Sequence, residues 1–95
     1  KPWREANVHI LTHGLHYASS VFEGARAYDG HIYALSTHSQ RLIDSAALMG
    51  FPLPWSVAEI DEACRQTLAA NGFTNAYVRP VAWRGSEQMG VSAQK

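Results

Sequence analysis

The stretch from Val21 to Tyr28, followed at once by Asp29-Gly30, constrains the fold more than any other segment of this chain. Side chains alternate between the two faces of a β-strand, so residues two apart share a face. One face would carry Phe22, Gly24, Arg26 and Tyr28, and the other Val21, Glu23, Ala25 and Ala27. Asp-Gly between this run and the apolar residues 31–35 predicts a hairpin, because both turn residues tolerate positive φ.

Two further segments are predicted before the middle of the chain. Asn7–Thr12 alternates like a short strand, which His13-Gly14 interrupts. Residues 37–49 carry apolar side chains at helical spacing, with Thr37 and Gln40 as a capping box at the start and Gly50 as the end. The predicted inward stripe of this helix is Leu42, Ala46 and Met49.

A second helix and a last strand complete the prediction. Ser56 and Glu59 form a capping box for a helix that runs to about Ala70 and faces inward through Ile60, Cys64 and Leu68. Residues 74–84 are predicted as a strand that is irregular at Pro80, because proline cannot donate a ladder hydrogen bond. The order of elements indicates an α+β fold, a small two-layer domain with two helices packed on one face of an antiparallel sheet.

Composition and charge exclude several classes of function. Apolar residues make up 46% and charged residues 17% of the chain, which is typical of a globular domain. Eight basic and eight acidic residues cancel, and no Lys/Arg run could follow a phosphate backbone, so we expect no nucleic-acid partner. The apolar runs are too short to span a bilayer, so we expect no membrane partner. The single cysteine, Cys64, favours a reducing, cytoplasmic setting.

Four motifs, in order along the chain, carry a resemblance to a known family. HGLHYASSVFEG followed by an arginine resembles the first active-site strand of fold-type-IV pyridoxal-phosphate aminotransferases. HSQRL is similar to the segment at the start of their first helix. AYVRP and GSEQMGV resemble the tyrosine-x-arginine strand and the following loop of the branched-chain subgroup. The chain therefore most resembles the branched-chain amino-acid aminotransferases.

The resemblance implies an activity and a cofactor for the full-length enzyme. It would move an amino group between leucine, isoleucine or valine and 2-oxoglutarate, with pyridoxal 5'-phosphate as the cofactor. Residues 1–95 would be its N-terminal small domain, with the first strand and the large C-terminal domain absent. The family's cofactor-binding lysine lies in that larger domain, and the two lysines here, Lys1 and Lys95, stand in no matching context. We therefore assign no catalytic residue to this chain and expect the fragment alone to be inactive.

The resemblance also implies roles for individual side chains. Arg41 would bind the cofactor phosphate. The substrate-binding residues would be Tyr17, Phe22, Gly24, Tyr77, Arg79 and Val91. Arg79 and Tyr17 would admit the side-chain carboxylate of glutamate, whereas Phe22, Tyr17 and Val91 would line the pocket for an aliphatic side chain. Because Tyr17 and the loop around Val91 reach into the partner subunit's site in this family, a homo-oligomer is implied, either a dimer or a multiple of it.

The residues by themselves leave other interpretations open. Arg41 would also fit a solvated ion pair with Asp44, three residues on. Tyr77 and Arg79 could simply stack on a sheet surface, and Gly24 could mark a bulge or a tight bend rather than close approach by a ligand.

The histidines and the rival families need separate consideration. His9, His13 and His16 have the spacing of metal ligands on one helix face, but this segment is predicted as strand and turn, so we expect no metal site. Rivals of the same fold are the D-amino-acid aminotransferases and the 4-amino-4-deoxychorismate lyases. A rival of another class is a binding module without catalysis.

Overall fold

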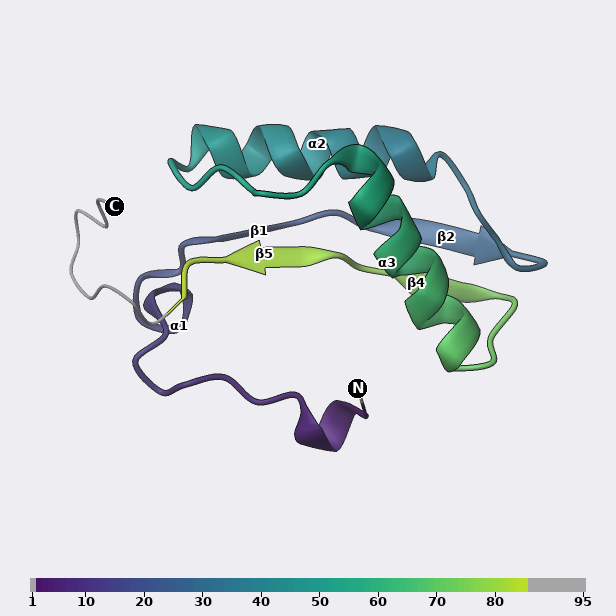
Figure 1. The fold of residues 1–95 in the computed structure, drawn as a ribbon, viewed down its shortest axis with the longest axis horizontal. Coiled ribbons are helices and arrows are strands. Elements are labelled where there is room, and N and C mark those ends of the chain that lie inside the picture. Colours follow the sequence, from purple (N-terminus) through teal and green to yellow (C-terminus); the bar gives the residue numbers. More distant parts are fainter. Residues whose placement is uncertain (1, 86–95) are drawn as a thin grey trace. The chain divides into compact units, whose positions relative to one another are not determined.

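The computed structural model describes residues 2–85, with two long helices and several short strands (Figure 1). In order, its elements are η1 (Trp3–Glu5), α1 (His13–Tyr17), β1 (Ser20–Phe22), β2 (Ala25–Tyr28), β3 (His31–Ile32), α2 (Leu35–Leu48), α3 (Val57–Ala70), β4 (Ala76–Val78) and β5 (Val81–Trp83). No helix in this part of the chain is long and apolar enough to cross a membrane. The chain divides into two compact units, Lys1–Ser20 with Trp83–Lys95, and Val21–Ala82.

The larger unit contains a three-stranded antiparallel sheet in the order β3-β2-β4. Its β2–β3 hairpin turns at Asp29 and Gly30, which both adopt positive φ, 51° and 80°, as the Asp-Gly signal predicts. On the other side of β2, Arg26 pairs with Tyr77 of β4. β1 and β5 form a separate two-stranded sheet.

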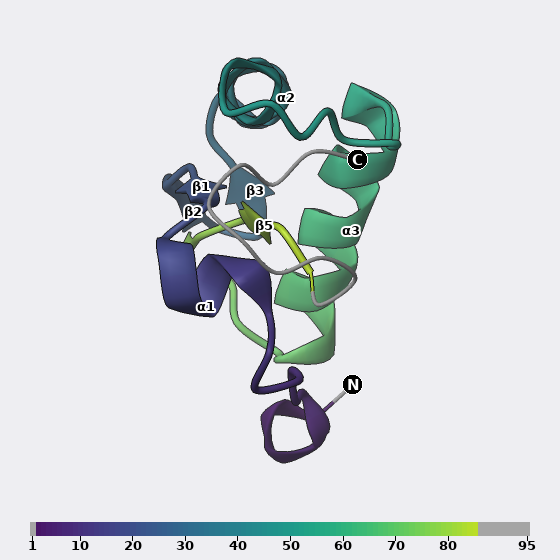
Figure 2. The same ribbon diagram turned by 90° about the vertical axis from the view of Figure 1, so that its left-hand side faces the viewer.

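The run Val21–Tyr28 does not form the single strand that its alternation predicts, because residues 23 and 24 separate β1 from β2, but burial confirms its two faces. Glu23, Ala25 and Ala27 are buried, whereas Phe22 and Tyr28 are exposed. The buried side meets α2 and α3, which lie over one face of the strands (Figure 2). The core cluster there is Leu35, Leu42, Ile60 and Cys64, with Val21, Ile32 and Val78 packed against it. The α+β, two-layer prediction is therefore confirmed.

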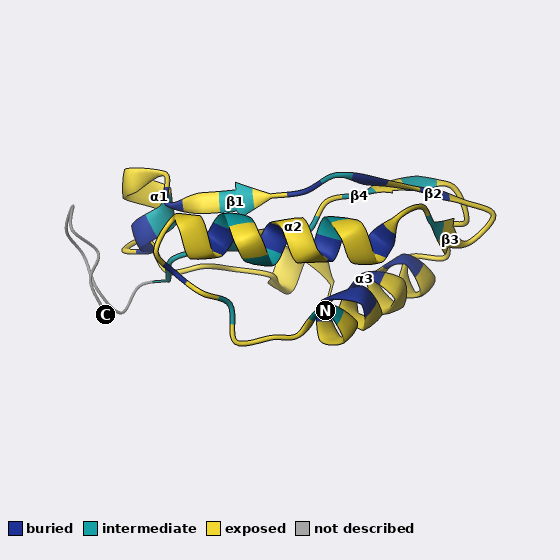
Figure 3. Cartoon of the chain, turned by 90° about the horizontal axis from the view of Figure 1, so that it is seen from above, coloured by how far each residue is buried: buried dark blue, intermediate teal, exposed yellow. Residues whose placement is uncertain are grey.

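Both helices bury one stripe and expose the rest (Figure 3). The predicted inward residues of α3, Ile60, Cys64 and Leu68, are all buried. In α2, Leu42 and Ala46 are buried as predicted, but Met49 is 45% exposed. The prediction for Met49 is wrong because α2 ends at Leu48 and Met49 is its C-cap, so helical spacing no longer places it inward.

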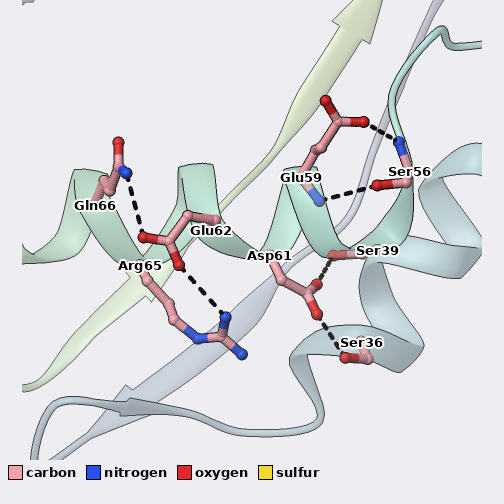
Figure 4. Close-up of polar contacts among 8 residues, drawn as sticks. All are labelled: Ser36, Ser39, Ser56, Glu59, Asp61, Glu62, Arg65 and Gln66. Carbon is pink, nitrogen blue, oxygen red and sulfur yellow. Dashed lines mark hydrogen bonds and ion pairs between the residues drawn. The ribbon is translucent and has the colours of Figure 1, made fainter.

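The two predicted capping boxes have different outcomes. At α3 the Ser56 hydroxyl accepts from the Glu59 amide at 3.2 Å and the Glu59 carboxylate accepts from the Ser56 amide at 2.9 Å, which confirms the prediction (Figure 4). The box at Thr37 and Gln40 is wrong, because α2 already begins at Leu35. Its N-cap is Ala34 in the left-handed region, with no side-chain cap.

The first turns of α2 are bound to α3 instead of being capped. The buried Asp61 carboxylate accepts from the Ser36 and Ser39 hydroxyls, each at 2.5 Å (Figure 4). Ser39 is itself fully buried. A buried carboxylate needs such donors, because an unpaired charge in the interior is costly.

The smaller unit departs from the prediction for Asn7–Thr12, which forms no strand. There Thr12 turns back on His9, whose carbonyl accepts from both the amide and the hydroxyl of Thr12. The next residues form the five-residue helix α1, which ends at Ala18 in the left-handed region. The pattern failed here because Val8 and Ile10 alternate with polar residues, but no strand within residues 2–85 pairs with this segment, and both side chains are exposed.

The last predicted strand is split. Residues 76–78 form β4 and residues 81–83 form β5, with Arg79 and Pro80 between them. The irregular stretch expected at Pro80 is therefore confirmed, because proline has no amide to continue the ladder. The Pro80 carbonyl still accepts from the Glu23 amide at 3.1 Å.

Candidate functional site

The exposed face of the larger unit gathers four of the predicted substrate-binding residues. Phe22 ends β1, Gly24 lies between β1 and β2, Tyr77 is in β4, and Arg79 follows β4. Their common face follows from strand alternation, since Arg26 pairs with Tyr77 on the side away from Ala25 and Ala27. Sheet pairing thus brings together residues more than fifty positions apart in the sequence.

Arg79 lies over the ring of Phe22. Its guanidinium carbon is 3.9 Å from the ring centroid, well within the range of a cation–π contact. Within residues 2–85 no carboxylate is paired with Arg79, whereas Arg41 and Arg65 each have one. The guanidinium is therefore held by an aromatic face and keeps its N–H donors for another group.

Tyr77 lies against Gly24. A Cβ placed on Gly24 would overlap the Tyr77 hydroxyl and would lie 2.6 Å from Cζ and 2.8 Å from Cε1 of that ring. The group that approaches this glycine closely is thus the phenol of a neighbouring strand. Tyr77 remains 54% exposed, so its other surface is open.

Arg41 belongs to a second group of polar side chains in the same unit. Glu23, at 9% exposure, is 2.8 Å from Nδ1 of His38 and 3.6 Å from Nε of Arg41. His38 and Arg41 lie one turn apart on α2 and thus share one carboxylate. The 3.6 Å distance between Nε of Arg41 and the Glu23 carboxylate is longer than an ordinary hydrogen bond, and most of the arginine side chain is exposed.

The resemblance of HSQRL to the start of a helix would place Arg41 beside free amides and the positive end of the helix dipole, and Asp44 is its other predicted partner; the structure corrects both expectations. Arg41 stands well inside α2, which begins at Leu35, so the free amides and dipole of a helix start do not act beside it. Its ion-pair partner is Glu23, and Asp44 instead accepts from Gln40 at 2.9 Å. The solvated Arg41–Asp44 pair is therefore wrong.

Tyr17 belongs to the smaller unit, where it ends α1. The ring of His13 lies under it, with ring centroids 4.6 Å apart, and Nδ1 of His13 is 2.6 Å from the Ser19 hydroxyl. His13 and Ser19 are buried, while Tyr17 is 43% exposed. The His13 ring, itself hydrogen-bonded to Ser19, packs against the tyrosine, which stays partly accessible. Val91 lies outside the described residues.

The other two histidines of the smaller unit make separate local contacts. Nδ1 of His9 accepts from the Leu11 amide at 3.0 Å, and Nε2 of His16 is 2.6 Å from the Ile10 carbonyl. Among residues 2–85 no three His, Cys, Asp or Glu side chains are grouped as metal ligands.

An open pocket of about 800 Å³ lies between α3 and the strands β4 and β5. Apolar side chains dominate its lining, and it includes Cys64, whose pKa is raised by burial and, to a lesser extent, by the nearby Asp61 carboxylate. A thiol with a raised pKa stays protonated at neutral pH, so Cys64 is a packing residue, as its place on an apolar helix stripe predicts.

The sequence analysis did not single out the residues that form the contacts around the predicted site residues. Glu23 is the one charged residue on the inward side of the Val21–Tyr28 run, and that anomaly was the available signal. His38, His13 and Ser19 gave no comparable signal, because their partners are fixed only by tertiary contacts.

Comparisons with known proteins show the family of the chain. The chain matches the family described as Amino-transferase class IV over residues 20–95, so it belongs to that family. It is 47% identical to a branched-chain-amino-acid aminotransferase of Pseudomonas aeruginosa and 45% identical to one of Escherichia coli, covering 96% and 95% of this chain. These alignments cover 31% and 30% of the relatives, so the chain spans about a third of their length.

Solved structures give the same result. The Escherichia coli branched-chain amino acid aminotransferase superposes with a TM-score of 0.87 at 44% identity, covering 93% of this chain and 31% of that one. A branched-chain aminotransferase from Thermoproteus uzoniensis, solved with norvaline, gives a TM-score of 0.87 at 35% identity, covering 97% of this chain and 33% of that one. A further branched-chain amino acid aminotransferase, complexed with N-(5'-phosphopyridoxyl)-L-glutamate, gives 0.89 at 37% identity, covering 95% and 32%.

Proposed function

We propose that the full-length protein containing this chain is a pyridoxal-phosphate-dependent branched-chain aminotransferase. It would exchange the amino group between leucine, isoleucine or valine and 2-oxoglutarate. Residues 1–95 would be its N-terminal small domain, inactive alone, which contributes contacts to the cofactor phosphate and to the substrate. The family membership of the chain and the names of its relatives support this function.

One observation carries the substrate side of the proposal. Arg79 has no carboxylate partner within residues 2–85 and lies over an aromatic ring on an exposed sheet face, with Tyr77 nearby. A branched-chain aminotransferase must accept both an aliphatic side chain and the carboxylate of glutamate. A guanidinium beside apolar walls suits both, because it can pair with the carboxylate that an apolar pocket alone would reject.

Arg41 fits the role of a phosphate-binding residue. Its side chain is largely exposed, and its long contact with Glu23 leaves the terminal N–H groups available to a phosphate monoester. The bound cofactor would supply the electron sink for amino transfer, which no side chain of a protein can provide. The part of this chain is then to hold the phosphate at Arg41 and to select the substrate through Arg79 and Tyr77.

The assembly and setting follow the same proposal. The resemblance that places Tyr17 and Val91 in the partner's site supports a homodimer. The unpaired Cys64 thiol supports a reducing, cytoplasmic setting. Light scattering of the purified full-length protein tests the dimer. A monomer that is fully active would contradict the shared-site argument.

The activity is tested with the purified full-length protein, by following amino transfer from L-leucine to 2-oxoglutarate. D-alanine and 4-amino-4-deoxychorismate serve as alternative substrates. Selective turnover of L-leucine, L-isoleucine and L-valine supports the proposal, and preference for either alternative replaces it with the corresponding rival function. Binding without any turnover would favour a binding module.

The cofactor role is tested by Arg41→Ala, which should weaken pyridoxal-phosphate affinity by about 1.5–3 kcal/mol, the range for a hydrogen bond to a charged group. Arg65→Ala is the matched control, since Arg65 is also a helix-surface arginine with one long carboxylate contact, 3.7 Å to Glu62. If the two variants bind pyridoxal phosphate with equal affinity, Arg41 only forms a structural ion pair with Glu23.

A further inference from the structure

We propose that Glu23 is a positioning residue for Arg41, and that its carboxylate orients the guanidinium so that the terminal N–H groups are free for the cofactor phosphate. The inference rests on the proposed function, which gives Arg41 that phosphate. Glu23 acts through Arg41 and does not itself bind the cofactor.

The sheet holds the Glu23 carboxylate in place. Glu23 follows β1, and its amide donates to the Pro80 carbonyl at 3.1 Å, so its main chain is fixed beside the segment between β4 and β5. Its side chain is only 9% exposed. A buried carboxylate has lost most of its water and needs nearby donors. The position of this carboxylate is therefore more closely defined than that of an acidic side chain on the surface.

The two carboxylate oxygens face two different side chains of α2. Oε1 is 2.8 Å from Nδ1 of His38, and Oε2 is 3.6 Å from Nε of Arg41. Because His38 and Arg41 are one helical turn apart, the short contact to His38 anchors the carboxylate against α2 and leaves its second oxygen beside the arginine. Among residues 2–85 no other carboxylate is paired with Arg41.

The nitrogen that faces Glu23 decides which donors Arg41 can offer. A guanidinium has one N–H on Nε and four on the two terminal nitrogens. Because Nε faces the carboxylate, the edge formed by the terminal nitrogens remains for a second anion, and that edge can bind two oxygens of a phosphate. The Arg41 side chain is 64% exposed, so without Glu23 it would lose more rotamer freedom on binding.

Glu23 also has an opposing effect, because its negative charge repels a phosphate. The hydrogen bond to His38 offsets part of that charge, and water around the exposed arginine screens the repulsion. Ordering a rotamer-rich side chain before binding is worth about two- to tenfold in affinity. We therefore expect the ordering of Arg41 to outweigh the repulsion.

The first test is Glu23→Gln in the full-length protein, freed of its cofactor and titrated calorimetrically with pyridoxamine 5'-phosphate. The amide keeps the size of the side chain and removes its charge, so the Kd should rise about two- to tenfold. The Kd of pyridoxamine, which lacks the phosphate, should stay unchanged. The matched control is Glu62→Gln, which neutralises the partner of Arg65 and should leave both Kd values unchanged.

The second test reverses the sign of the effect. Lysine has a single charged nitrogen, which cannot face Glu23 and the phosphate with separate donor edges. Arg41→Lys should therefore bind pyridoxamine 5'-phosphate about as weakly as Arg41→Ala, because the buried carboxylate takes the ammonium group. Adding Glu23→Gln to Arg41→Lys should then lower the Kd, although the same substitution raises it beside Arg41. A defect of the fold would not change sign between the two backgrounds.

Contrary results would overturn the positioning role. If Glu23→Gln weakens the binding of both compounds equally, Glu23 is a residue of the fold. If it tightens the binding of pyridoxamine 5'-phosphate, the carboxylate acts only by repulsion. An unchanged Kd, or the same effect beside Arg41 and in Arg41→Lys, also overturns the proposal.

The same titrations separate this inference from the proposed function. If Arg41→Ala raises the Kd of pyridoxamine 5'-phosphate and Glu23→Gln does not, only the positioning role fails. If Arg41→Ala leaves that Kd unchanged, the phosphate role of Arg41 in the proposed function is refuted. Because no turnover is measured, the result for Glu23 stands even if the protein transfers no amino group from leucine.

Discussion

Replacement of Gly24 by alanine tests the reasoning about the sheet face most directly. The added Cβ would overlap the Tyr77 hydroxyl and stand 2.6 Å from Cζ, so the tyrosine must move. Tyr77 is half exposed and its ring can swing outward, so the cost is that of a mild overpacking, about 1–3 kcal/mol. Gly24 has no positive φ, and alanine there restricts the unfolded chain, which returns about 0.4–1 kcal/mol. The net loss of unfolding free energy should be about 1 kcal/mol, the difference between these two effects.

The sign of the effect depends on Tyr77. In a Tyr77→Ala background the overlap is gone, so Gly24→Ala should stabilise by about 0.4–1 kcal/mol, the unfolded-state effect alone. Urea denaturation of the four ligand-free proteins of this double-mutant cycle measures both values. Gly30→Ala is a contrasting control, because it meets no atom within 4 Å but requires positive φ, and it should destabilise in both backgrounds. If Gly24→Ala changes stability equally in both backgrounds, Tyr77 does not lie on Gly24.

Three further predictions concern the capping box, the buried thiol and the buried carboxylate. Ser56→Ala should lower the unfolding free energy by about 0.5–2 kcal/mol, whereas Thr37→Ala should cost nothing comparable because no capping box forms there; urea denaturation of both decides it. Because the folded pKa of Cys64 is raised above its usual 9.0, the contribution of this thiol to stability should be full below pH 9 and be lost as pH rises through the folded pKa. Asp61→Asn should lower the pKa of Cys64, measured by thiol alkylation against pH, and an unchanged pKa would exclude the carboxylate as a cause. Glu23→Gln should destabilise by about 1–3 kcal/mol, measured by denaturation, since it weakens the contacts to two side chains of α2; a neutral effect would mean that the carboxylate is not needed there.

The sequence alone determined the elements whose signals are local. The Ser56–Glu59 box, the inward stripe of α3 and the Asp29-Gly30 turn depend on residues within a few positions of one another. The two faces of residues 21–28 follow from strand geometry once a strand forms, whatever the partner. These features could therefore be predicted before any tertiary contact was known.

Where the pattern failed, the presence or absence of a contact with a distant segment decided the outcome. Residues 7–12 alternate like a strand, but a strand needs a neighbour to accept its hydrogen bonds, and in the described part of the chain no strand pairs with them. The start of α2 is set by Ala34 and by Asp61, which lies more than twenty residues away and takes the Ser36 and Ser39 hydroxyls. A serine-rich helix start indicates a cap only when no such acceptor is present.

For the candidate site, the sequence supplied the residue types and the tertiary structure supplied the partners. Arg41, Tyr77 and Arg79 could be singled out as residues able to bind anions or substrates. That Arg79 lies on Phe22, Tyr77 on Gly24 and Arg41 beside Glu23 follows only from strand pairing and helix packing. Spacing along one chain fixes which side chains share a face, but the neighbour across the sheet is chosen by register, which no single segment encodes.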